Sequence, residues 1–408
     1  MTTATDVVVV GGGATGVGVA RDLALRGVDV TLVERGSLAA GTSGRNHGVL
    51  HAGARYADTD PASARDCLAE RRILGEIAPH CVEATGGLFC ALPDDVGYLE
   101  AKRAACEACD IPVESLDGNA ARRLEPELSP AIERALRVPT GTFDPFRLTA
   151  ATAASAEAAG ASIRTGTTVV DVRTTGERVV GVEVRPSAGG PTEVVRAEHV
   201  VNAAGAWAGQ LASLAGVEVA VVPVGGAMTA VAPRLVDAVV HRGRPRGEGD
   251  IAAPHGDATV LGTTAQPIDD PDAFEPDPDA AAFLAAELAD LVPAVAEARV
   301  VRTYVGVRPL LLDPDDADLD PNAATRDFQV VDHDARDGLA GLTSVVGGKL
   351  TTHRLMAERV ADRVCGDLGV EAACRTAETP LPGIGDEATM ARVLARYGIA
   401  DGLETAPW

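Results

Sequence analysis

Residues 6–35, "DVVVVGGGATGVGVARDLALRGVDVTLVER", constrain the fold of this chain more than any other segment. The apolar run 6–10 predicts a strand, the glycines after it predict a tight turn, and residues 14–26 predict a helix. A second apolar run at 29–33 predicts another strand. A strand, a glycine-rich turn, a helix and a second strand in this order predict an α/β fold with a parallel sheet.

The glycines of this turn have the spacing that a dinucleotide site requires. Gly11 permits the tight turn, Gly13 lets the backbone approach a pyrophosphate, and Gly16 lets the helix pack against the strand. The amides of Ala14 and Thr15, at the start of the helix, are then available to phosphate oxygens.

An acidic residue ends the second strand. Glu34 follows Gly11 by 23 residues, and its carboxylate is placed to accept hydrogen bonds from ribose hydroxyls, with Arg35 beside it. A carboxylate at this position disfavours a 2′-phosphate and so argues against NADP. The alternative, a glycine-rich turn that binds nothing, fits less well with the strand before it and the helix after it.

Later segments favour FAD over NAD. The predicted elements are a helix and a short strand in 146–164, strands at 167–173, 179–185, 194–201 and 342–346, and an amphipathic helix after the last strand. Ala203-Ala204-Gly205 and Gly347-Gly348 each lie between a strand and a helix, so that the second helix directs its dipole at an electron-rich group. A Rossmann unit completed by mid-chain and C-terminal segments is unlike NAD dehydrogenases and typical of FAD oxidoreductases.

The charge of the chain restricts its partners. Acidic residues number 59 against 36 basic ones, which argues against nucleic acid as a partner. Only Lys102 and Lys349 are lysines, and this composition resembles that of haloarchaeal cytoplasmic proteins. The N-terminus runs into a strand without a basic segment, and the apolar region 200–233 is interrupted by polar residues, so we expect a cytoplasmic chain without a membrane span.

The seven cysteines are scattered and odd in number, so we expect reduced, structural thiols. Cys106 and Cys109 have the spacing of a redox or metal motif, but no second pair completes a ligand set. The sequence therefore predicts no metal site.

The stretch "GRNHGVLHAGARY", residues 44–56, gathers arginine, histidine and glycine in an acidic chain. Such a loop is suited to hold an anion and move a proton. Thr42 and Ser43, just before it, are placed to bond a pyrophosphate or a ribityl chain.

Together these segments resemble the FAD-dependent glycerol-3-phosphate dehydrogenases, and most closely the catalytic A subunits of the anaerobic type. The resemblance extends from about residue 6 to about residue 385. It rests on "GGGATGVGVARDLALRG", "GTSGRNHGVLHAGARYA", "GTFDPFRLT", "VVNAAGAWA", "YVGVRPL", "TRDF" and "GGKLTTHRLMAE", in the family's order.

The resemblance implies an α/β fold of two domains, as in glycine oxidase and D-amino-acid oxidase. One is a discontinuous, Rossmann-like FAD-binding domain, and the other is an α+β substrate domain with an antiparallel sheet. The implied bounds are 1–80, 145–222 and 333–375 for the FAD-binding domain, 81–144 and 223–332 for the substrate domain, and 376–408 for a C-terminal tail.

The implied reaction oxidises sn-glycerol 3-phosphate to glycerone phosphate and leaves FADH2. It requires a phosphate anchor, for which the guanidinium groups of Arg55, Arg308 and Arg326 are predicted, with Arg308 also taking part in catalysis. Tyr56 and Lys349 complete the implied substrate site. For Arg326, in the loop-like "DPNAATRDF", a surface ion pair is the alternative.

His51 is the predicted proton acceptor, because imidazole titrates near neutrality. Its spacing from Arg55 puts both on one face of a helical turn; a structural core histidine is the alternative. The predicted FAD contacts are Gly11, Gly13, Ala14, Thr15, Gly16, Glu34, Arg35, Thr42, Ser43, His47, Val170, Ala204, Gly205, Trp207, Gly347, Gly348, Lys349, Leu350 and Thr351.

Two departures from the family bear on electron exit and on the site. The family's A subunits continue into a cysteine-rich domain, and this chain stops at Trp408 without it. We expect electrons to pass to a quinone or carrier, and partner subunits to dock the chain at the cytoplasmic face of the membrane. His353 stands where the family has tyrosine, and we assign it no catalytic role.

Two alternatives to this function stay open. One is an FAD-dependent oxidoreductase of the same fold that acts on 2-hydroxy acids or amino acids, because carboxylates also bind arginine. The other is a flavin-binding subunit without catalysis.

Overall fold

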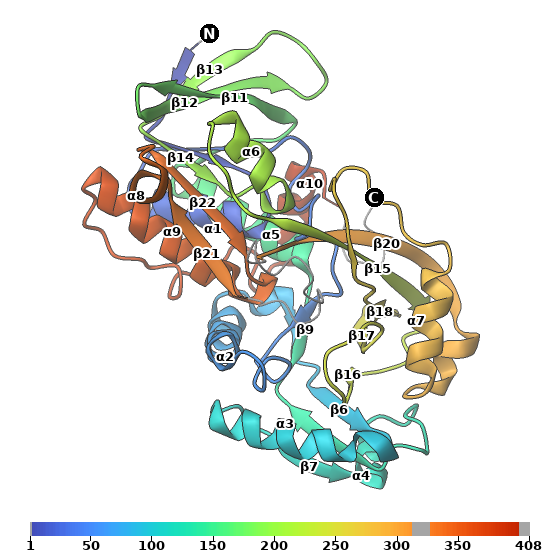
Figure 1. Ribbon diagram of the computed structural model, residues 1–408. Helices are drawn as coiled ribbons and strands as arrows, with labels where there is room; N and C mark the ends of the chain where they lie inside the picture. The colour runs from blue at the N-terminus through green and yellow to red at the C-terminus, as the bar shows by residue number, and fades with distance from the viewer. Residues whose placement is uncertain (1, 312–326, 400–408) are drawn as a thin grey trace.

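The computed structural model describes residues 2–311 and 327–399. Its first body contains a six-stranded sheet in the order β10, β3, β2, β14, β22 and β21. Figure 1 labels β14, β22 and β21 of this sheet. All neighbours pair in parallel except β21, which is antiparallel to β22. The strands are β2 (Val7–Val10), β3 (Val30–Val33), β10 (Ser162–Arg164), β14 (His199–Asn202), β21 (Phe328–Asp332) and β22 (Leu342–Gly347).

The burial of "VVVV" in β2 shows how this sheet is covered on both faces. Val7 and Val9 pack with Val17 and Leu23 of α1, whereas Val8 and Val10 pack toward a second sheet. This alternation is the period of a strand, and burial on both faces is typical of a parallel sheet. The helices on the first face are α1 (Ala14–Leu25), α5 (Pro145–Ala158) and α9 (His353–Leu368).

The second sheet has four strands in the order β1, β13, β12 and β11. They are β1 (Thr2–Ala4), β11 (Thr167–Thr175), β12 (Arg178–Pro186) and β13 (Glu193–Arg196). The strand predicted at 194–201 is wrong as a single element, because β13 and β14 belong to different sheets. At Ala197 and Glu198 the chain crosses between them: the Ala197 amide bonds to Val180 O in one sheet and the Glu198 amide to Asp6 O beside the other.

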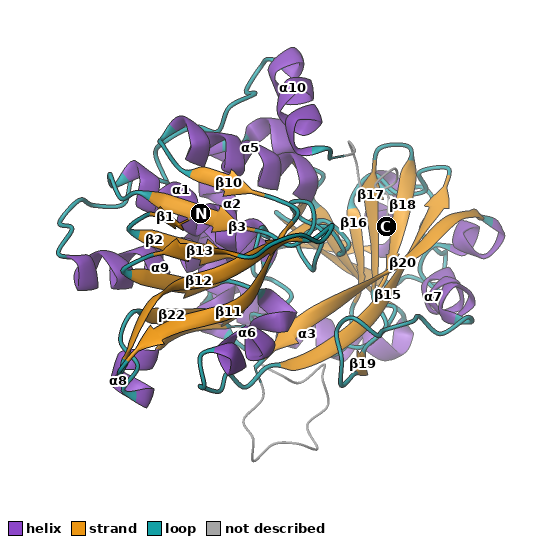
Figure 2. Cartoon of the chain, turned by 90° about the horizontal axis from the view of Figure 1, so that it is seen from above, coloured by secondary structure: helices purple, strands orange, loops and turns teal. Residues whose placement is uncertain are grey.

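The second body contains a nine-stranded sheet, in which β15 and β20 pair antiparallel along their whole length (Figure 2). In this sheet β6 and β16 pair in parallel, and all other neighbouring strands pair antiparallel. The strands are β6 (Gly87–Ala91), β7 (Glu114–Asp117), β8 (Arg134–Val138), β15 (Val222–Ala232), β16 (Val239–Arg242), β17 (Ile251–His255), β18 (Ala258–Gly262), β19 (Gln266–Pro267) and β20 (Arg299–Leu310).

Shorter elements surround and connect the two bodies. Three short strands form a small sheet of their own, in the order β4, β9 and β5. The elements are β4 (Val49–Leu50), β5 (Val82–Glu83), β9 (Gly141–Phe143), α2 (Pro61–Ile77), α3 (Val96–Ala108), α4 (Gly118–Leu124), α6 (Ala208–Leu214), α7 (Ala280–Ala289), α8 (His333–Asp337) and α10 (Glu387–Tyr397).

The fold agrees with the predicted α/β class and with an antiparallel second sheet. One segment differs: the implied bounds 223–332 assign β21 to the substrate domain, whereas it forms an edge of the six-stranded sheet. The domain bounds as a whole stay a prediction.

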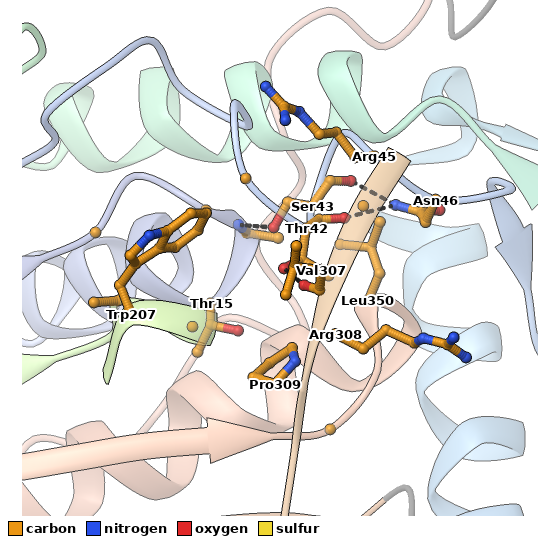
Figure 3. A pocket seen from close by; sticks show the side chains of 18 of the residues that line it. Thr15, Thr42, Ser43, Arg45, Asn46, Trp207, Val307, Arg308, Pro309 and Leu350 are labelled. Carbon is orange, nitrogen blue, oxygen red and sulfur yellow. Dashed lines mark hydrogen bonds between the residues drawn. The ribbon is translucent and has the colours of Figure 1, made fainter. Parts of the chain in front are cut away.

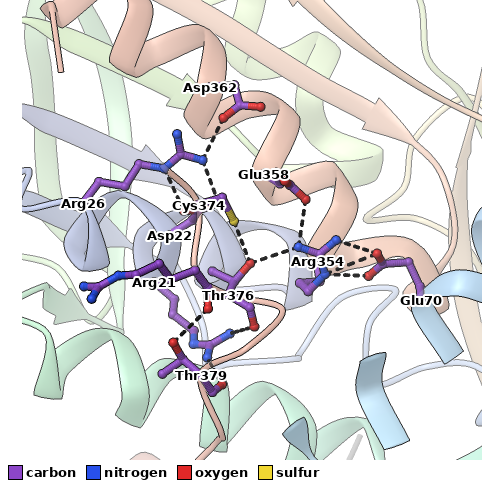
Figure 4. Close-up of polar contacts among 11 residues, drawn as sticks. Arg21, Asp22, Arg26, Glu70, Arg354, Glu358, Asp362, Cys374, Thr376 and Thr379 are labelled. Carbon is purple, nitrogen blue, oxygen red and sulfur yellow. Dashed lines mark hydrogen bonds and ion pairs between the residues drawn. The ribbon is translucent and has the colours of Figure 1, made fainter. Parts of the chain in front are cut away.

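The segment after α9 is tied to the first body by buried arginines (Figure 4). Arg21 of α1 donates to the carbonyls of Thr376 (3.3 Å) and Thr379 (2.5 Å), and Arg354 of α9 donates to Thr376 Oγ1 at 3.0 Å. Arg354 is itself paired with buried Glu70 of α2 at 2.6 Å. The start of the predicted tail, at Thr376 and Thr379, is therefore held against the first body.

Within the described residues, no helix is long and apolar enough to cross a membrane. The same part of the chain holds no group of three or more histidine, cysteine or acidic side chains placed to bind a metal. Cys106 and Cys109 are both buried, and burial raises the pKa of Cys106 to about 11.

Candidate active site

A cavity of about 850 Å³ lies between the two bodies. One wall is formed where the parallel strands of the first sheet end, at Val10, Val33, Ala203 and Val346. The other wall comes from the second sheet, mainly residues 305–310 of β20. A crevice outside the carboxyl ends of parallel strands is where α/β folds bind ligands, and the volume suits a large one.

The first glycine turn is packed against the sheet as closely as its sequence predicts. Gly11 has φ +118°, and a Cβ there would lie 2.4 Å from the carbonyl oxygen of Ala203. A Cβ on Gly16 would lie 1.9 Å from the carbonyl oxygen of Gly11. Gly13 precedes α1 without a side-chain cap, while the Ala14 amide donates to Ser43 Oγ at 2.9 Å. The start of α1 is thus open to the cavity and suits an anion.

Glu34 is held at the edge of this turn by two backbone amides. Its Oε2 accepts from the Gly12 amide at 2.7 Å and its Oε1 from the Gly36 amide at 2.6 Å. These bonds fix the carboxylate at the cavity wall, where ribose hydroxyls are expected.

An aromatic ring closes the same end of the cavity. The Arg35 guanidinium lies 4.4 Å from the Trp207 ring centroid and pairs with Asp272 at 2.7 Å. Val169 lines the cavity, and the predicted contact Val170 does not. The remaining predicted FAD contacts line it except Gly16, which packs against the Gly11 carbonyl instead.

The loop 42–48 passes between the two bodies and is bonded to both (Figure 3). Thr42 Oγ1 donates to the Val307 carbonyl at 2.5 Å, and the Tyr304 hydroxyl donates to the Asn46 carbonyl at 2.9 Å. A Cβ on Gly306 would lie 2.0 Å from the Arg45 carbonyl oxygen, so β20 approaches the loop backbone directly. The loop therefore presents its side chains at a fixed position.

The second glycine pair ends β22 in a backbone conformation that favours glycine. Gly347 has φ +81° and Gly348 has φ +76°. Thr351, just beyond, accepts a hydrogen bond from the His51 amide at 3.1 Å. This contact joins the turn before α9 to the loop that carries His51.

His51 lies in the cavity beside two other rings. Its ring centroid is 5.2 Å from that of Tyr56 and 5.9 Å from that of His47. Burial, and then the nearby His47, His241, Arg55 and Lys349, lower its pKa well below the usual value. The ring is therefore neutral at neutral pH and free to accept a proton, although it does not titrate near neutrality as expected.

The helical turn assumed for residues 51–55 is absent. The chain instead turns at residues 53–56, where the Tyr56 amide bonds to the Gly53 carbonyl at 2.8 Å. His51 and Arg55 nevertheless line the same cavity.

The predicted cations meet different partners. Arg55 pairs with buried Asp250 at 3.5 Å, and Lys349 Nζ donates to Ser63 Oγ at 2.9 Å. Arg308 donates to the Thr264 carbonyl at 2.8 Å, and burial lowers its pKa to about 10, so it stays charged at neutral pH. Arg326 lies outside the described residues.

Among the polar cavity residues that sequence reasoning missed are Arg45, Asn46 and Arg246. Two of them stand inside "GRNHGVLHAGARY" itself. Arg246 belongs to "HRGRPRGEGD", residues 241–250, which combines arginine and glycine in the same way as that stretch. This shared composition is the sequence signal that could have indicated Arg246 as a cavity residue.

His353 also lines the cavity, but its ring is engaged by the backbone. Its Nδ1 lies 2.8 Å from the Leu350 carbonyl oxygen, and burial lowers its pKa to about 4. This arrangement agrees with a structural role.

The cavity fits a flavin dinucleotide on the chemistry of its residues. An open helix start, a ribose-directed carboxylate and two glycine turns follow one another along one wall. A family model described as FAD dependent oxidoreductase matches residues 6–363. The chain belongs to the family of FAD-dependent oxidoreductases, and its cofactor is FAD, as predicted.

Individual relatives narrow the comparison. Anaerobic glycerol-3-phosphate dehydrogenase subunit A1 of Haloferax volcanii is 49% identical over 96% of this chain and 69% of its own length. Glycine oxidase from Geobacillus kaustophilus matches the fold with a TM-score of 0.74 at 25% identity, over 93% of this chain and 98% of its own. Glycerol-3-phosphate dehydrogenase from Bacillus halodurans, solved with FAD, matches the fold with a TM-score of 0.72 at 27% identity, over 93% of this chain and 68% of its own. The predicted fold class is confirmed.

Proposed function

We propose that this chain oxidises the C2 hydroxyl of sn-glycerol 3-phosphate and produces glycerone phosphate. One observation carries the proposal: a single cavity joins the dinucleotide wall to a group of cations around the neutral His51. The relatives named glycerol-3-phosphate dehydrogenase support it.

The residues of the chain divide the work of the reaction. FAD, when bound, supplies the hydride acceptor. Arg55, Tyr56, Arg308 and Lys349 bind and orient the substrate, and Arg326 is predicted to join them. His51 takes the proton of the C2 hydroxyl as the C–O bond becomes a carbonyl, and it is suited to do so because it is uncharged. The positive charge of Arg308 stabilises the oxygen as it loses that proton.

Anaerobic reduction of the flavin tests this function. FAD-loaded protein in concentrated potassium chloride is mixed with sn-glycerol 3-phosphate while the visible absorbance of the flavin is followed. Glycerol, the opposite enantiomer and 2-hydroxyglutarate serve as controls. We expect rapid bleaching by sn-glycerol 3-phosphate alone.

Any other result of this bleaching experiment would indicate a different function. Bleaching by 2-hydroxyglutarate or an amino acid instead would assign the arginines to a carboxylate. A flavin that stays bound but is bleached by none of these compounds would indicate a non-catalytic flavin subunit.

The electron acceptor and the partners belong to the same proposal. The Haloferax relative is named as a subunit, which supports partner subunits for this chain as well. We infer that they take electrons from the flavin to a quinone or carrier and hold the chain at the cytoplasmic face of the membrane. Co-purification of the tagged chain with such subunits, in the membrane fraction, tests this part.

A further inference from the structure

We propose that Arg246 is an anchor for the substrate phosphate, acting with Lys349 across the ring of Tyr56. This inference rests on the proposed function and names part of its substrate site. It starts from a difference in how the arginines at the cavity are paired.

Asp250 forms ion pairs with Arg55, which lines the cavity, and with Arg244, which does not. It is almost fully buried, lies 3.5 Å from Arg55 and bonds to Arg244 at 3.1 Å. Arg244 also pairs with Glu287 at 2.7 Å. A buried carboxylate shared in this way holds its partners in place, so Arg55 and Arg244 are poorly placed to neutralise a dianion as well.

Arg246 is different, because nothing in the described part of the chain neutralises it. It lines the cavity, and no hydrogen bond or ion pair to another described residue engages its guanidinium. Its guanidinium carbon lies 5.6 Å from the Tyr56 ring centroid, and the ammonium of Lys349 lies 4.9 Å from the same centroid. Two cations therefore face one ring at the cavity wall.

The loop that carries Arg246 is fixed by its own residues. The Gly247 amide donates to Asp250 Oδ2 at 2.5 Å, and the Gly249 amide donates to the Thr263 carbonyl at 3.2 Å. A Cβ on Gly249, where φ is +65°, would lie 2.8 Å from Glu287 Cβ. The guanidinium of Arg246 is thus presented by a braced backbone, which lowers the entropic cost of binding an anion.

The charge in this corner suits a phosphate dianion. Arg246 and Lys349 supply two positive charges, and Arg308 adds a third on the same cavity. Burial lowers the pKa of Arg308, and nearby Glu248 acts in the opposite direction. A carboxylate ligand needs only one of these cations, whereas a dianion with three equivalent oxygens uses several donors at once.

Replacement of Arg246 tests the proposal. Anaerobic bleaching is measured against the concentration of sn-glycerol 3-phosphate for the wild type, R246Q, R246K and the control R123Q, an exposed arginine on α4. We expect KM to rise about 10- to 100-fold in R246Q, with kcat changed much less, since a charged hydrogen bond to the phosphate is lost. R246K, which keeps the charge, is expected to lie between, and R123Q to match the wild type.

A binding measurement separates this proposal from the proposed function. Calorimetric titration with inorganic phosphate requires no turnover, and R246Q is expected to bind it at least 10-fold more weakly than the wild type and R123Q. If R246Q keeps its flavin and shows wild-type KM and phosphate affinity, Arg246 is not the anchor, even when the wild type is bleached by the substrate. If the wild type is not bleached but R246Q alone loses phosphate affinity, the anchor stands and the reaction is wrong.

Discussion

The two ends of the cavity are built in different ways. The dinucleotide end comes mainly from one continuous segment, residues 10–43, where glycines and backbone amides do most of the binding. The substrate end is assembled from side chains of residues 51–56, 246, 308 and 349. The first depends on local backbone geometry, and the second on the packing of distant segments. Changes in the two regions should therefore fail in different ways.

The largest expected effect is loss of the cofactor from the first region. G11A adds a methyl group that would lie 2.4 Å from the Ala203 carbonyl oxygen, at φ +118°. We expect the free energy of unfolding to fall by about 2–4 kcal/mol and the FAD content to fall at least 10-fold. The absorbance ratio of flavin to protein and chemical denaturation measure both.

G97A is the matched control, because a Cβ at Gly97 meets nothing within 4 Å. It adds the same atom outside the cavity. Full FAD content in G11A would show that the turn does not determine cofactor binding.

The second prediction leaves the cofactor bound and removes the chemistry. H51Q is expected to keep its FAD and to lose about 100- to 10,000-fold in kcat, because the proton acceptor is missing. For the wild type we expect a rate that is constant at neutrality and falls only in acid, since the pKa of His51 lies well below its usual value of 6.5. H51Q should lack this acidic limb. A rate within 10-fold of wild type would leave His51 with a structural role.

The third prediction concerns the ion pair of buried Lys102 with partly exposed Asp58, beside the substrate end. Lys102 of α3 is fully buried, and its ammonium bonds to Asp58, which also accepts the Tyr98 hydroxyl at 2.6 Å. Asp58 follows Arg55 and Tyr56 on the same turn, so Lys102 is a positioning residue for them. K102M leaves the part-buried carboxylate of Asp58 without its cation, and we expect a loss of about 1–3 kcal/mol of stability and a several-fold higher KM.

K102R is the matched variant, because it keeps the charge. We expect it to recover part of the stability, with KM closer to the wild-type value. Equal KM values for the wild type, K102M and K102R would remove the link between α3 and the substrate site.

The smallest predicted effect is common to both regions and depends on pH. Burial lowers the pKa of His199, His255 and His353 to about 4. Below about pH 6.5 the unfolded chain binds protons on these rings and the folded chain does not. The contribution of these histidines to the free energy of unfolding is therefore fully present above that pH and is lost as the pH falls below it. In all, seven of the eight histidines have a lowered pKa. The pKa values of the Glu70 and Glu125 carboxyls are raised, and these two groups change the stability with pH in the opposite direction.

Thermal unfolding in concentrated salt measures this effect. We expect Tm to fall by several degrees between pH 7.5 and pH 5.5. A Tm that is constant or rises over this range would contradict the burial of neutral histidines.

The dinucleotide end was largely predictable from the sequence, because its geometry is local. Gly11, Gly13 and Glu34 act through spacing along one strand–turn–helix unit, and spacing is visible in a sequence. The structure places Val169, and not the predicted Val170, at the cavity, and the reason is again local. The pairing of β11 shifts register between Val169 and Asp171, and such an irregularity changes which side chains face the cavity.

The substrate end was predictable only in part, because its properties arise from tertiary packing. Arg55 and Arg246 are both arginines beside glycine-rich turns, and only the folded structure shows that Arg55 pairs with Asp250 while Arg246 has no ion-pair partner among the described residues. The low pKa of His51 likewise depends on burial by segments far away in the sequence. The roles of these residues stay predictions until they are measured.

A crystal structure of the FAD-loaded protein with glycerone phosphate would test the central claim most directly, since it locates both ends of the cavity at once. The account predicts FAD along the Gly11–Glu34 wall, the phosphate within about 3 Å of Arg246 and Lys349, and the C2 oxygen beside His51. A phosphate bound away from Arg246, or a C2 oxygen remote from His51, would contradict it.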